Sequence, residues 1–219
     1  MSVKAVLFDM DGVLLDSEPL HDKINEDIYA ALGINIDKST VNEFIGRVSS
    51  ERWTTLKERY SLKPSVDELN DWQWRDLVAA LPDSGVGPSA GLDILLGFLR
   101  EEKIRATIAS SSRRAFVEAV IDHLELRDHM SGYTCGEESA RCKPAPDIFL
   151  LAARKLGVDP RECLVIEDSC AGVRAAKAAG MYTVGYINPT SEGQDLSEAD
   201  VTVDKLQDVC RILSELNGK

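Results

Sequence analysis

The sequence has little of what membrane proteins and nucleic-acid-binding proteins need. Its 219 residues contain no apolar run close to the ~20 residues that a membrane-spanning helix requires. Its 25 lysines and arginines are outnumbered by 37 aspartates and glutamates, and the formal net charge is -12. Because binding to nucleic acids or to anionic membranes relies on clustered positive charge, we expect neither as a partner and expect a small molecule instead.

Cysteine and histidine are also scarce. The five cysteines form no Cys-x-x-Cys pair, and the three histidines are scattered. This pattern indicates neither a disulfide framework nor a zinc site, so we interpret the cysteines as reduced and mostly buried small hydrophobes. The first 15 residues lack the basic start and the small-residue cleavage site of a secretory signal peptide, which predicts a cytoplasmic protein. A monomer is expected.

Short apolar runs are present and follow a regular order. The first, Val3–Phe8, is almost unbroken, which predicts a strand buried on both faces. From residue 86 onward such runs alternate with helical patterns, and this alternation predicts an α/β fold with a doubly wound parallel sheet. The expected later strands are 105–109, 133–134, 163–166, 182–187 and 201–203, and the expected later helices end near 102, cover 113–124, 147–156 and 171–179, and begin at 205.

A helical insertion separates the first strand from the others. After Ser17, a possible cap, and Pro19, apolar residues recur at helical spacing until Gly33. Further helices are expected near 39–45, 50–60 and 66–81, with three tryptophans as a small core. The turn-rich segment 82–88 ends the insertion. We therefore expect a core of residues 1–15 and 86–219 and a helical domain of residues 16–85.

Two carboxylates follow the first strand. Asp9 and Asp11 are two residues apart, so in an extended segment their side chains point the same way. In parallel sheets, ligands bind beyond the carboxyl ends of the strands. Two neighbouring carboxylates repel each other unless a cation neutralises them. On their own, however, these residues and Gly12 also fit an ordinary polar turn after a strand.

Polar residues follow three later strands as well. They are Ser110–Ser112 before Arg113, Lys143 before a proline, and the acidic pair Glu167 and Asp168. Hydroxyls and backbone N–H groups at a helix start can bind an anion, although caps and turns use the same residues. A lysine near acidic strand ends can offset the charge of a phosphoryl group. Taken together, the four strand ends favour phosphoryl chemistry.

With these segments the sequence resembles the haloacid dehalogenase-like superfamily, in the branch whose helical cap follows the first motif. The stretches DMDGVLLDSEPLH, KPAPDIF and IEDSCAGVRAAKAAGM carry the resemblance, which covers nearly the whole chain. The sequence is similar to sugar-phosphate phosphatases and beta-phosphoglucomutases of that branch. The resemblance implies a Rossmann-like core with residues 16–85 as a cap, and a magnesium-dependent phosphatase acting on a small phosphorylated metabolite, such as a sugar phosphate.

The resemblance also implies roles for single residues. Asp9 is expected to be the nucleophile that forms an aspartyl phosphate, and Asp11 the general acid and base. Ser110 and Lys143 are expected to bind the transferring phosphate oxygens. The implied magnesium ligands are Asp9, the backbone carbonyl of Asp11, and Asp168, with Glu167 bound directly or through another ligand.

Substrate contacts are expected from the cap and from the second strand end. The implied residues are His21, Arg47, Ser111, Ser112 and Arg113. An ungapped match places the arginine with which a mutase holds its second phosphate on Ser49 of this chain. This disfavours a mutase, although Arg47 or Arg52 could substitute. Cys142 stands where the family usually has glycine, which puts the local turn geometry in question.

Two other functions stay open. A beta-phosphoglucomutase would convert beta-glucose 1-phosphate to glucose 6-phosphate without net phosphate release. A phospho-accepting signalling module like a receiver domain also uses acids, a hydroxyl and a lysine on a parallel sheet. Receivers, however, place the acceptor on a central strand and lack a long insertion after the first strand, so this chain fits them poorly.

Overall fold

A parallel sheet positions the candidate site. The computed structural model describes residues 2–44, 49–189 and 193–218. The sheet has six strands in the order β3-β2-β1-β4-β5-β6, and every pairing is parallel. This confirms the predicted doubly wound α/β fold. The strands are β1 (Ala5–Phe8), β2 (Arg105–Ala109), β3 (Tyr133–Thr134), β4 (Cys163–Glu167), β5 (Tyr182–Tyr186) and β6 (Val201–Val203).

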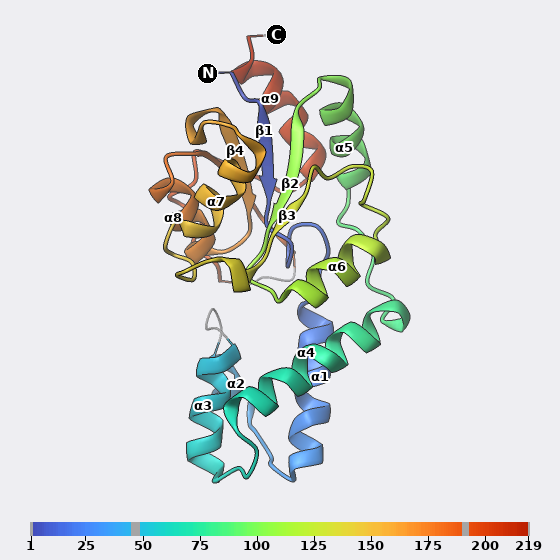
Figure 1. The fold of residues 1–219 in the computed structure, drawn as a ribbon, viewed down its shortest axis with the longest axis vertical. Helices are drawn as coiled ribbons and strands as arrows, with labels where there is room; N and C mark the ends of the chain where they lie inside the picture. The colour runs from blue at the N-terminus through green and yellow to red at the C-terminus, as the bar shows by residue number, and fades with distance from the viewer. Residues whose placement is uncertain (1, 45–48, 190–192, 219) are drawn as a thin grey trace. The chain divides into compact units, whose positions relative to one another are not determined.

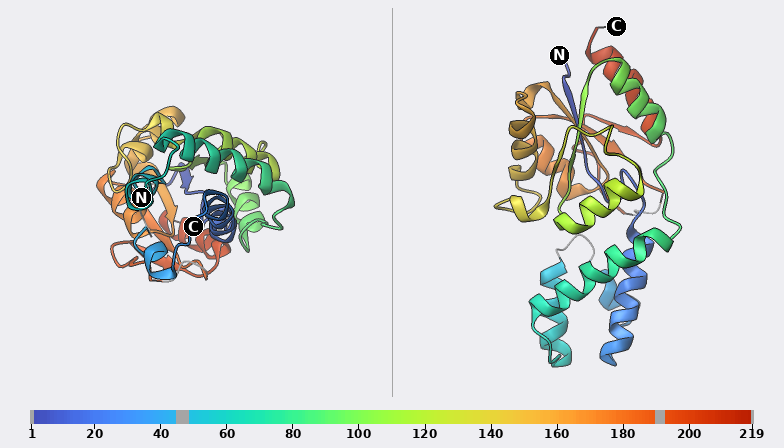
Figure 2. Two further views of the ribbon diagram at one scale, coloured as in Figure 1. Left: turned by 90° about the horizontal axis from the view of Figure 1, so that it is seen from below. Right: turned by 45° about the vertical axis from the view of Figure 1, so that its right-hand side comes forward.

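Helices cover both faces of the sheet. α7 and α8 pack on one face, and α5 and α9 lie together on the other (Figure 1 and Figure 2). The helices of this part are α5 (Leu92–Glu101), α6 (Arg114–His123), α7 (Asp147–Leu156), α8 (Cys170–Ala178) and α9 (Val209–Leu216). Short 3-10 turns lie at η2 (Gly136–Glu138), η3 (Pro160–Glu162) and η4 (Leu206–Asp208). The closing helix predicted from Lys205 therefore begins as a 3-10 turn.

β1 is one of the two middle strands of the sheet, and its side chains are apolar on both faces. All four of its residues are fully buried, and it pairs with β2 on one side and β4 on the other. Asp9 therefore follows a central strand, as the acceptor of a receiver domain does, so only the helical insertion after β1 still sets the chain apart from receivers. The chain builds the sheet outward from β1 to β3 and then returns to the opposite side of β1 with β4. The carboxyl ends of β1 and β4 thus meet where the strand order reverses, which is where ligands bind in sheets of this kind.

Small residues let two helices approach the sheet closely. α7 contributes Ala152 and Ala153, and α8 contributes Ala175 and Ala176, to a core cluster that also contains Leu7 of β1. Because alanine side chains are short, the helix backbones can lie near the strands, and the loops leading into both helices stay close to the strand ends. These loops carry Lys143 and Asp168.

The second compact unit is helical. The chain divides into Met1–Ser17 with Val86–Lys219, and Glu18–Gly85. The described residues of the second unit include no strand. They form α1 (Glu18–Leu32), α2 (Lys38–Asn42), α3 (Ser49–Tyr60), α4 (Val66–Ala80) and the 3-10 turn η1 (Leu81–Asp83). Leu56, Leu69 and Leu77 are fully buried in this unit.

Two expectations about side chains were only partly right. Trp53 is fully buried, but Trp72 and Trp74 are partly exposed, because Gln73 between them takes the inward position on α4. All five cysteines are free in the structure, and only Cys135 and Cys163 are buried, so the expectation that most of them are buried was wrong. Cys142 is exposed because it lies in a loop before α7. Within the described part of the chain, every helix is too short or too polar to cross a membrane.

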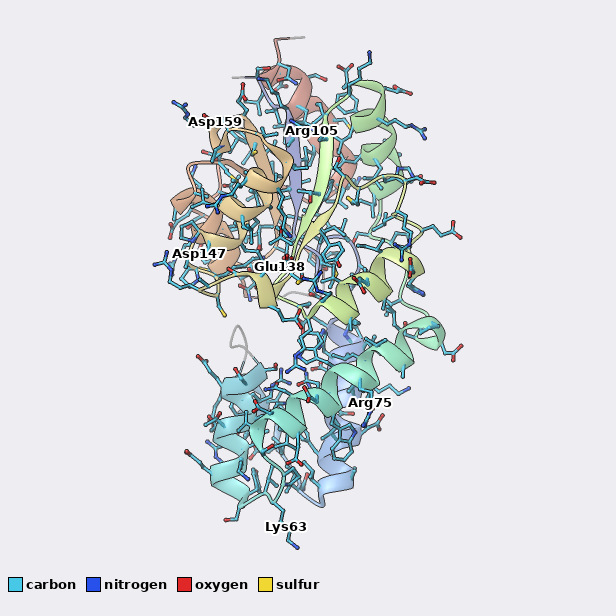
Figure 3. All side chains as sticks on the ribbon, in the orientation of Figure 1. Lys63, Arg75, Arg105, Glu138, Asp147 and Asp159 are labelled. Carbon is cyan, nitrogen blue, oxygen red and sulfur yellow. The ribbon has the colours of Figure 1, made fainter. Side chains whose placement is uncertain are left out.

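An ion pair ties the 3-10 turn η2 to α7 and generates a prediction about acid stability. Lys155 donates to both carboxylate oxygens of Glu138 at 2.8 Å, and the Cys135 backbone N–H donates to the same carboxylate at 3.2 Å (Figure 3). These contacts, chiefly the hydrogen bond from Lys155, lower the pKa of Glu138 from 4.5 to about 2. The Glu138 side chain is 24% exposed, so solvent weakens the interaction.

We expect Glu138→Gln to reduce the free energy of unfolding by about 1 kcal/mol at pH 7. Because the folded pKa lies below the unfolded one, this contribution is complete above about pH 4.5 and disappears as the pH falls towards 2. Urea unfolding of both proteins between pH 7 and pH 3 measures the difference. A difference that stays constant over this range would contradict the assignment.

Candidate active site

A buried lysine joins two of the predicted acids. The ammonium nitrogen of Lys143 lies 2.6 Å from Oδ1 of Asp9 and 2.5 Å from Oε1 of Glu167. The three side chains come from the end of β1, the loop before α7 and the end of β4. The Lys143 side chain is 9% exposed and the Glu167 side chain is fully buried. Charged pairs this well shielded from water interact far more strongly than surface pairs.

The loop that carries Lys143 is fixed at both ends. Arg141 pairs with Asp147 of α7 at 2.8 Å, and the Ala145 N–H donates to the Cys142 carbonyl at 3.0 Å. The ammonium also lies 5.1 Å from the centre of the Phe149 ring, within cation–π range. The exposed Cys142 therefore sits in a closed turn, and the lysine side chain is directed at the strand ends from a defined position.

Negative charge exceeds positive charge at this point. Burial is the main cause that raises the pKa of Asp9 well above its usual range, and the neighbouring carboxylates raise it further against the opposing effect of Lys143. Those carboxylates belong to Glu167, Asp168 and Asp11. Burial alone would lower the pKa of Lys143, but Asp9 and Glu167 more than offset this and raise it. A single ammonium therefore faces several acids.

Three of the acids form a candidate cation site. Ligand oxygens of Asp9, Glu167 and Asp168 lie within 4.8 Å of one another, and all three residues are buried. Hard divalent cations such as Mg²⁺ and Ca²⁺ prefer carboxylate oxygens of this kind. An added divalent cation would also balance the acids that Lys143 leaves uncompensated. The residues present therefore fit a hard divalent cation.

Two glycines make room for these carboxylates. Gly12 has a φ of +80°, and a Cβ there would lie 2.0 Å from Oδ2 of Asp168. A Cβ on Gly172, in the first turn of α8, would lie 1.8 Å from Oε1 of Glu167. Any side chain at either position would displace an acid of the cluster. The close approach of backbone and carboxylate explains why glycine follows each acidic pair.

The Asp11 carboxylate lies between serine hydroxyls. Ser17 donates to Oδ1 at 2.5 Å, and Ser112 donates to Oδ2 at 2.6 Å. Ser110 reaches the same Oδ2 at 3.4 Å. The sequence pattern predicts Ser17 as a possible helix cap, whereas its hydroxyl contacts Asp11, a contact that no local pattern indicates. The two aspartates thus occupy different surroundings, Asp9 beside an ammonium and Asp11 among hydroxyls.

The three serines after β2 do not act alike. Ser110 and Ser112 are buried, and the Ser112 N–H donates to the Ser110 hydroxyl at 3.0 Å. Ser111 is exposed, and Arg113 is the partly exposed residue that precedes α6. Of the three serines and Arg113, the structure therefore brings Ser110 and Ser112 to Asp11. That these four residues contact a phosphate stays a prediction.

Ser169 is a further site residue that is not among the candidates predicted from the sequence. It is the N-cap of α8, where its hydroxyl accepts from the Gly172 N–H at 3.0 Å. The same hydroxyl donates to Oε2 of Glu167 at 2.9 Å, and the Ser169 N–H donates to that oxygen at 3.0 Å. Glu167 is thereby held on one oxygen by Lys143 and on the other by Ser169.

The predicted substrate contacts in the helical unit are less defined. His21 lies on α1, and its ring meets the Trp74 ring edge-on at 5.9 Å between centroids. Arg47 falls outside the described residues, as does Gly46. The role of His21 and Arg47 in binding a substrate stays a prediction.

The chain matches a protein-family model and several known proteins. A model of haloacid dehalogenase-like hydrolases matches residues 3–180. The chain is 32% identical over 216 residues to beta-phosphoglucomutase of Bacillus subtilis, covering 94% of this chain and 92% of the relative. It is 27% identical over 216 residues to the phosphorylated carbohydrates phosphatase of Thermotoga maritima, covering 98% and 100%.

Longer proteins and solved structures match too. The chain spans only 54% of the bifunctional riboflavin kinase/FMN phosphatase of Arabidopsis thaliana, with 32% identity over 205 residues and 93% of this chain covered. The crystal structure of CbbY from Rhodobacter sphaeroides in complex with phosphate has a TM-score of 0.86 and 26% identity, covering 94% of this chain and 96% of that one.

The close contact at Gly172 generates a prediction. Alanine normally stabilises a helix interior relative to glycine by about 0.5–1 kcal/mol. We expect Gly97→Ala in α5 to show this gain, because a Cβ there meets no distant atom of the described chain within 4 Å. Gly172→Ala should instead lose about 1–3 kcal/mol, because its Cβ would overlap Glu167. Equal gains in denaturant unfolding for the two variants would contradict the described geometry.

Proposed function

This chain belongs to the haloacid dehalogenase-like hydrolases, and on that basis we propose that it is a phosphatase that hydrolyses a small sugar phosphate through an aspartyl phosphate on Asp9. The observation that carries this proposal is the buried contact of Lys143 with both Asp9 and Glu167, at 2.6 and 2.5 Å, beside Asp168. A nucleophilic carboxylate must approach a phosphate anion, and this arrangement supplies positive charge where the two anions would meet.

The reaction would proceed in two displacements. A carboxylate oxygen of Asp9 attacks phosphorus, the bond from phosphorus to the sugar oxygen breaks, and Asp11 gives its proton to that oxygen. Water then attacks the phosphoryl group, Asp11 takes a proton from the water, and the Asp9 carboxylate is released with inorganic phosphate. Each residue returns to its initial state.

The serines around Asp11 support its assignment as the proton carrier. Hydrogen bonds of 2.5 and 2.6 Å from Ser17 and Ser112 fix the orientation of its carboxyl group. Lys143 bonds to Asp9 and serine hydroxyls bond to Asp11, so the acid that attacks phosphorus and the acid that moves protons lie in different surroundings. Opposite environments for two carboxyl groups are the usual way to divide such roles.

We propose magnesium as the cation of the acidic cluster. Asp9, Glu167 and Asp168 would hold it. When bound, such a cation offsets the charge of the phosphate and of the carboxylates around it. Lys143 and Ser110 then bind phosphate oxygens in this proposal, and Lys143 keeps Asp9 oriented.

The helical unit is proposed to serve as a cap that limits access of water and reads the organic part of the substrate. His21 and Arg47 are its proposed substrate contacts. A mutase is the second candidate, favoured by the identity with beta-phosphoglucomutase. Ser49, however, stands where the second phosphate of a mutase intermediate needs a cation, and its hydroxyl donates to Oδ1 of Asn70 at 2.8 Å.

Phosphate release from a panel of sugar phosphates and p-nitrophenyl phosphate tests the function. We expect turnover that is lost on removal of divalent metal and restored by Mg²⁺. Asp9→Asn should reduce it at least about a thousandfold, because an amide is a poor nucleophile. Asp159→Asn, at the opposite end of β4 in an exposed turn, serves as the matched control and should retain full activity (Figure 3).

Metal-dependent release that survives Asp9→Asn would refute the nucleophile assignment. Conversion of beta-glucose 1-phosphate to glucose 6-phosphate without phosphate release would favour the mutase instead.

A further inference from the structure

The ammonium group of Lys143 has one recorded neighbour that is not an oxygen. Its nitrogen lies 2.6 Å from Oδ1 of Asp9, 2.5 Å from Oε1 of Glu167 and 3.4 Å from the carbonyl oxygen of Ala109. An ammonium has three protons, and these three acceptors match them. The nitrogen also lies over the ring of Phe149, at 5.1 Å from the ring centre. The ring therefore contacts this cation in addition to its hydrogen-bond acceptors.

Phe149 is held in place by the core. It lies in the first turn of α7 and is fully buried. It belongs to the same core cluster as Leu7 of β1 and Ala109 of β2. Ala109 also supplies the carbonyl oxygen beside Lys143. The ring and this acceptor are thus parts of one packed core, and the ring cannot turn away from the lysine without disturbing its neighbours.

A phenylalanine ring affects a buried cation in a way that an aliphatic side chain does not. The face of the ring carries partial negative charge, and it attracts a cation most strongly where water is excluded. The Lys143 side chain is only 9% exposed. A leucine at position 149 would be apolar but would lack this attraction. The ring therefore replaces part of the hydration that the ammonium has lost.

The proposed reaction changes two partners of the lysine and leaves the ring as it was. The carboxylate of Asp9 becomes an acyl phosphate, and Glu167 belongs to the cluster proposed to hold a cation. The carbonyl of Ala109 does not change, but it is the most distant of the three acceptors. Phe149 therefore attracts the ammonium to the same position before and after phosphoryl transfer.

We propose that Phe149 is a positioning residue for the phosphatase reaction, and that the face of its ring holds the Lys143 ammonium where it contacts both Asp9 and the transferring phosphate. This inference rests on the proposed phosphatase function. The ring touches neither the substrate nor the cation, and it acts through the lysine. The proposal assigns an electrostatic role to a residue whose burial alone would indicate only packing.

Fluorinated rings test this role, because fluorine withdraws negative charge from the ring face and changes the size of the ring little. Phe149 is replaced site-specifically by ring-difluorinated and by ring-trifluorinated phenylalanine. We expect kcat/KM for a sugar phosphate that the wild-type protein hydrolyses to fall in two steps, by about fivefold with three fluorines. A ring that only fills space would show no dependence on the number of fluorines.

Two further variants control for packing. Phe98 of α5 lies on the opposite face of the sheet, and the same fluorinated residues there should leave kcat/KM unchanged (Figure 1). Phe149→Leu removes the ring and should lower kcat/KM at least as much as three fluorines do.

Three outcomes would overturn the proposal. One is full activity in both fluorinated proteins together with a loss in Phe149→Leu, which would make Phe149 a packing residue. Another is an equal loss with two and with three fluorines. The third is an equal loss when Phe98 is fluorinated. A wild-type protein that hydrolyses none of the phosphorylated compounds would instead refute the proposed function, and this inference with it.

Discussion

The contact of one buried ammonium with two carboxylates is the constraint on which the site depends. Lys143 lies within 2.6 Å of Asp9 and 2.5 Å of Glu167, and these acids end two adjacent strands. Without the lysine, burial of both acids beside Asp168 would be strongly unfavourable. With it, one positive charge still faces three carboxylates, so the cluster keeps a capacity for a further cation. The same charges that make the site costly to fold make it suited to an anionic substrate bound with a metal ion.

The fold supplies this constraint through topology and through small residues. The strand order reverses beside β1, which brings the ends of β1 and β4 together, and the loop into α7 delivers the lysine to them. Glycines at positions 12 and 172 let the backbone approach the carboxylates of Asp168 and Glu167. Serines fix the remaining oxygens, with Ser169 on Glu167 and Ser112 on Asp11. Glycines and serines that look like ordinary turn and cap residues in the sequence therefore contact the acids of the site in the structure.

The fold could be predicted from the sequence because a local pattern of apolar residues marks each strand and helix. The almost unbroken apolar run before Asp9 predicted a strand buried on both faces, and the residues of β1 are fully buried. The helix predicted at 147–156 has those bounds in the structure. The order of polar strand ends also indicated which residues meet, since parallel strands bring their carboxyl ends to one edge. The sequence could not indicate that Ser17 turns back to Asp11 or that Trp72 and Trp74 stay partly exposed. Nor could it indicate that Oδ1 of Asn25 has no hydrogen-bond partner among the described residues. Each of these depends on which distant side chain fills the space opposite, and periodicity carries no such information.

The most direct test of the central claim is to locate the phosphoryl group during turnover. The Asp11→Ala variant should accumulate the intermediate from p-nitrophenyl phosphate, because p-nitrophenolate leaves without being protonated and the variant lacks the base that activates water for the second displacement. After mixing the variant with p-nitrophenyl phosphate and Mg²⁺, acid quenching and borohydride reduction would convert a phosphorylated aspartate to homoserine, which peptide mass spectrometry can locate. The account predicts homoserine at position 9 and none when Asp9→Asn is added. Homoserine at another position, or phosphate release without any modified residue, would contradict it.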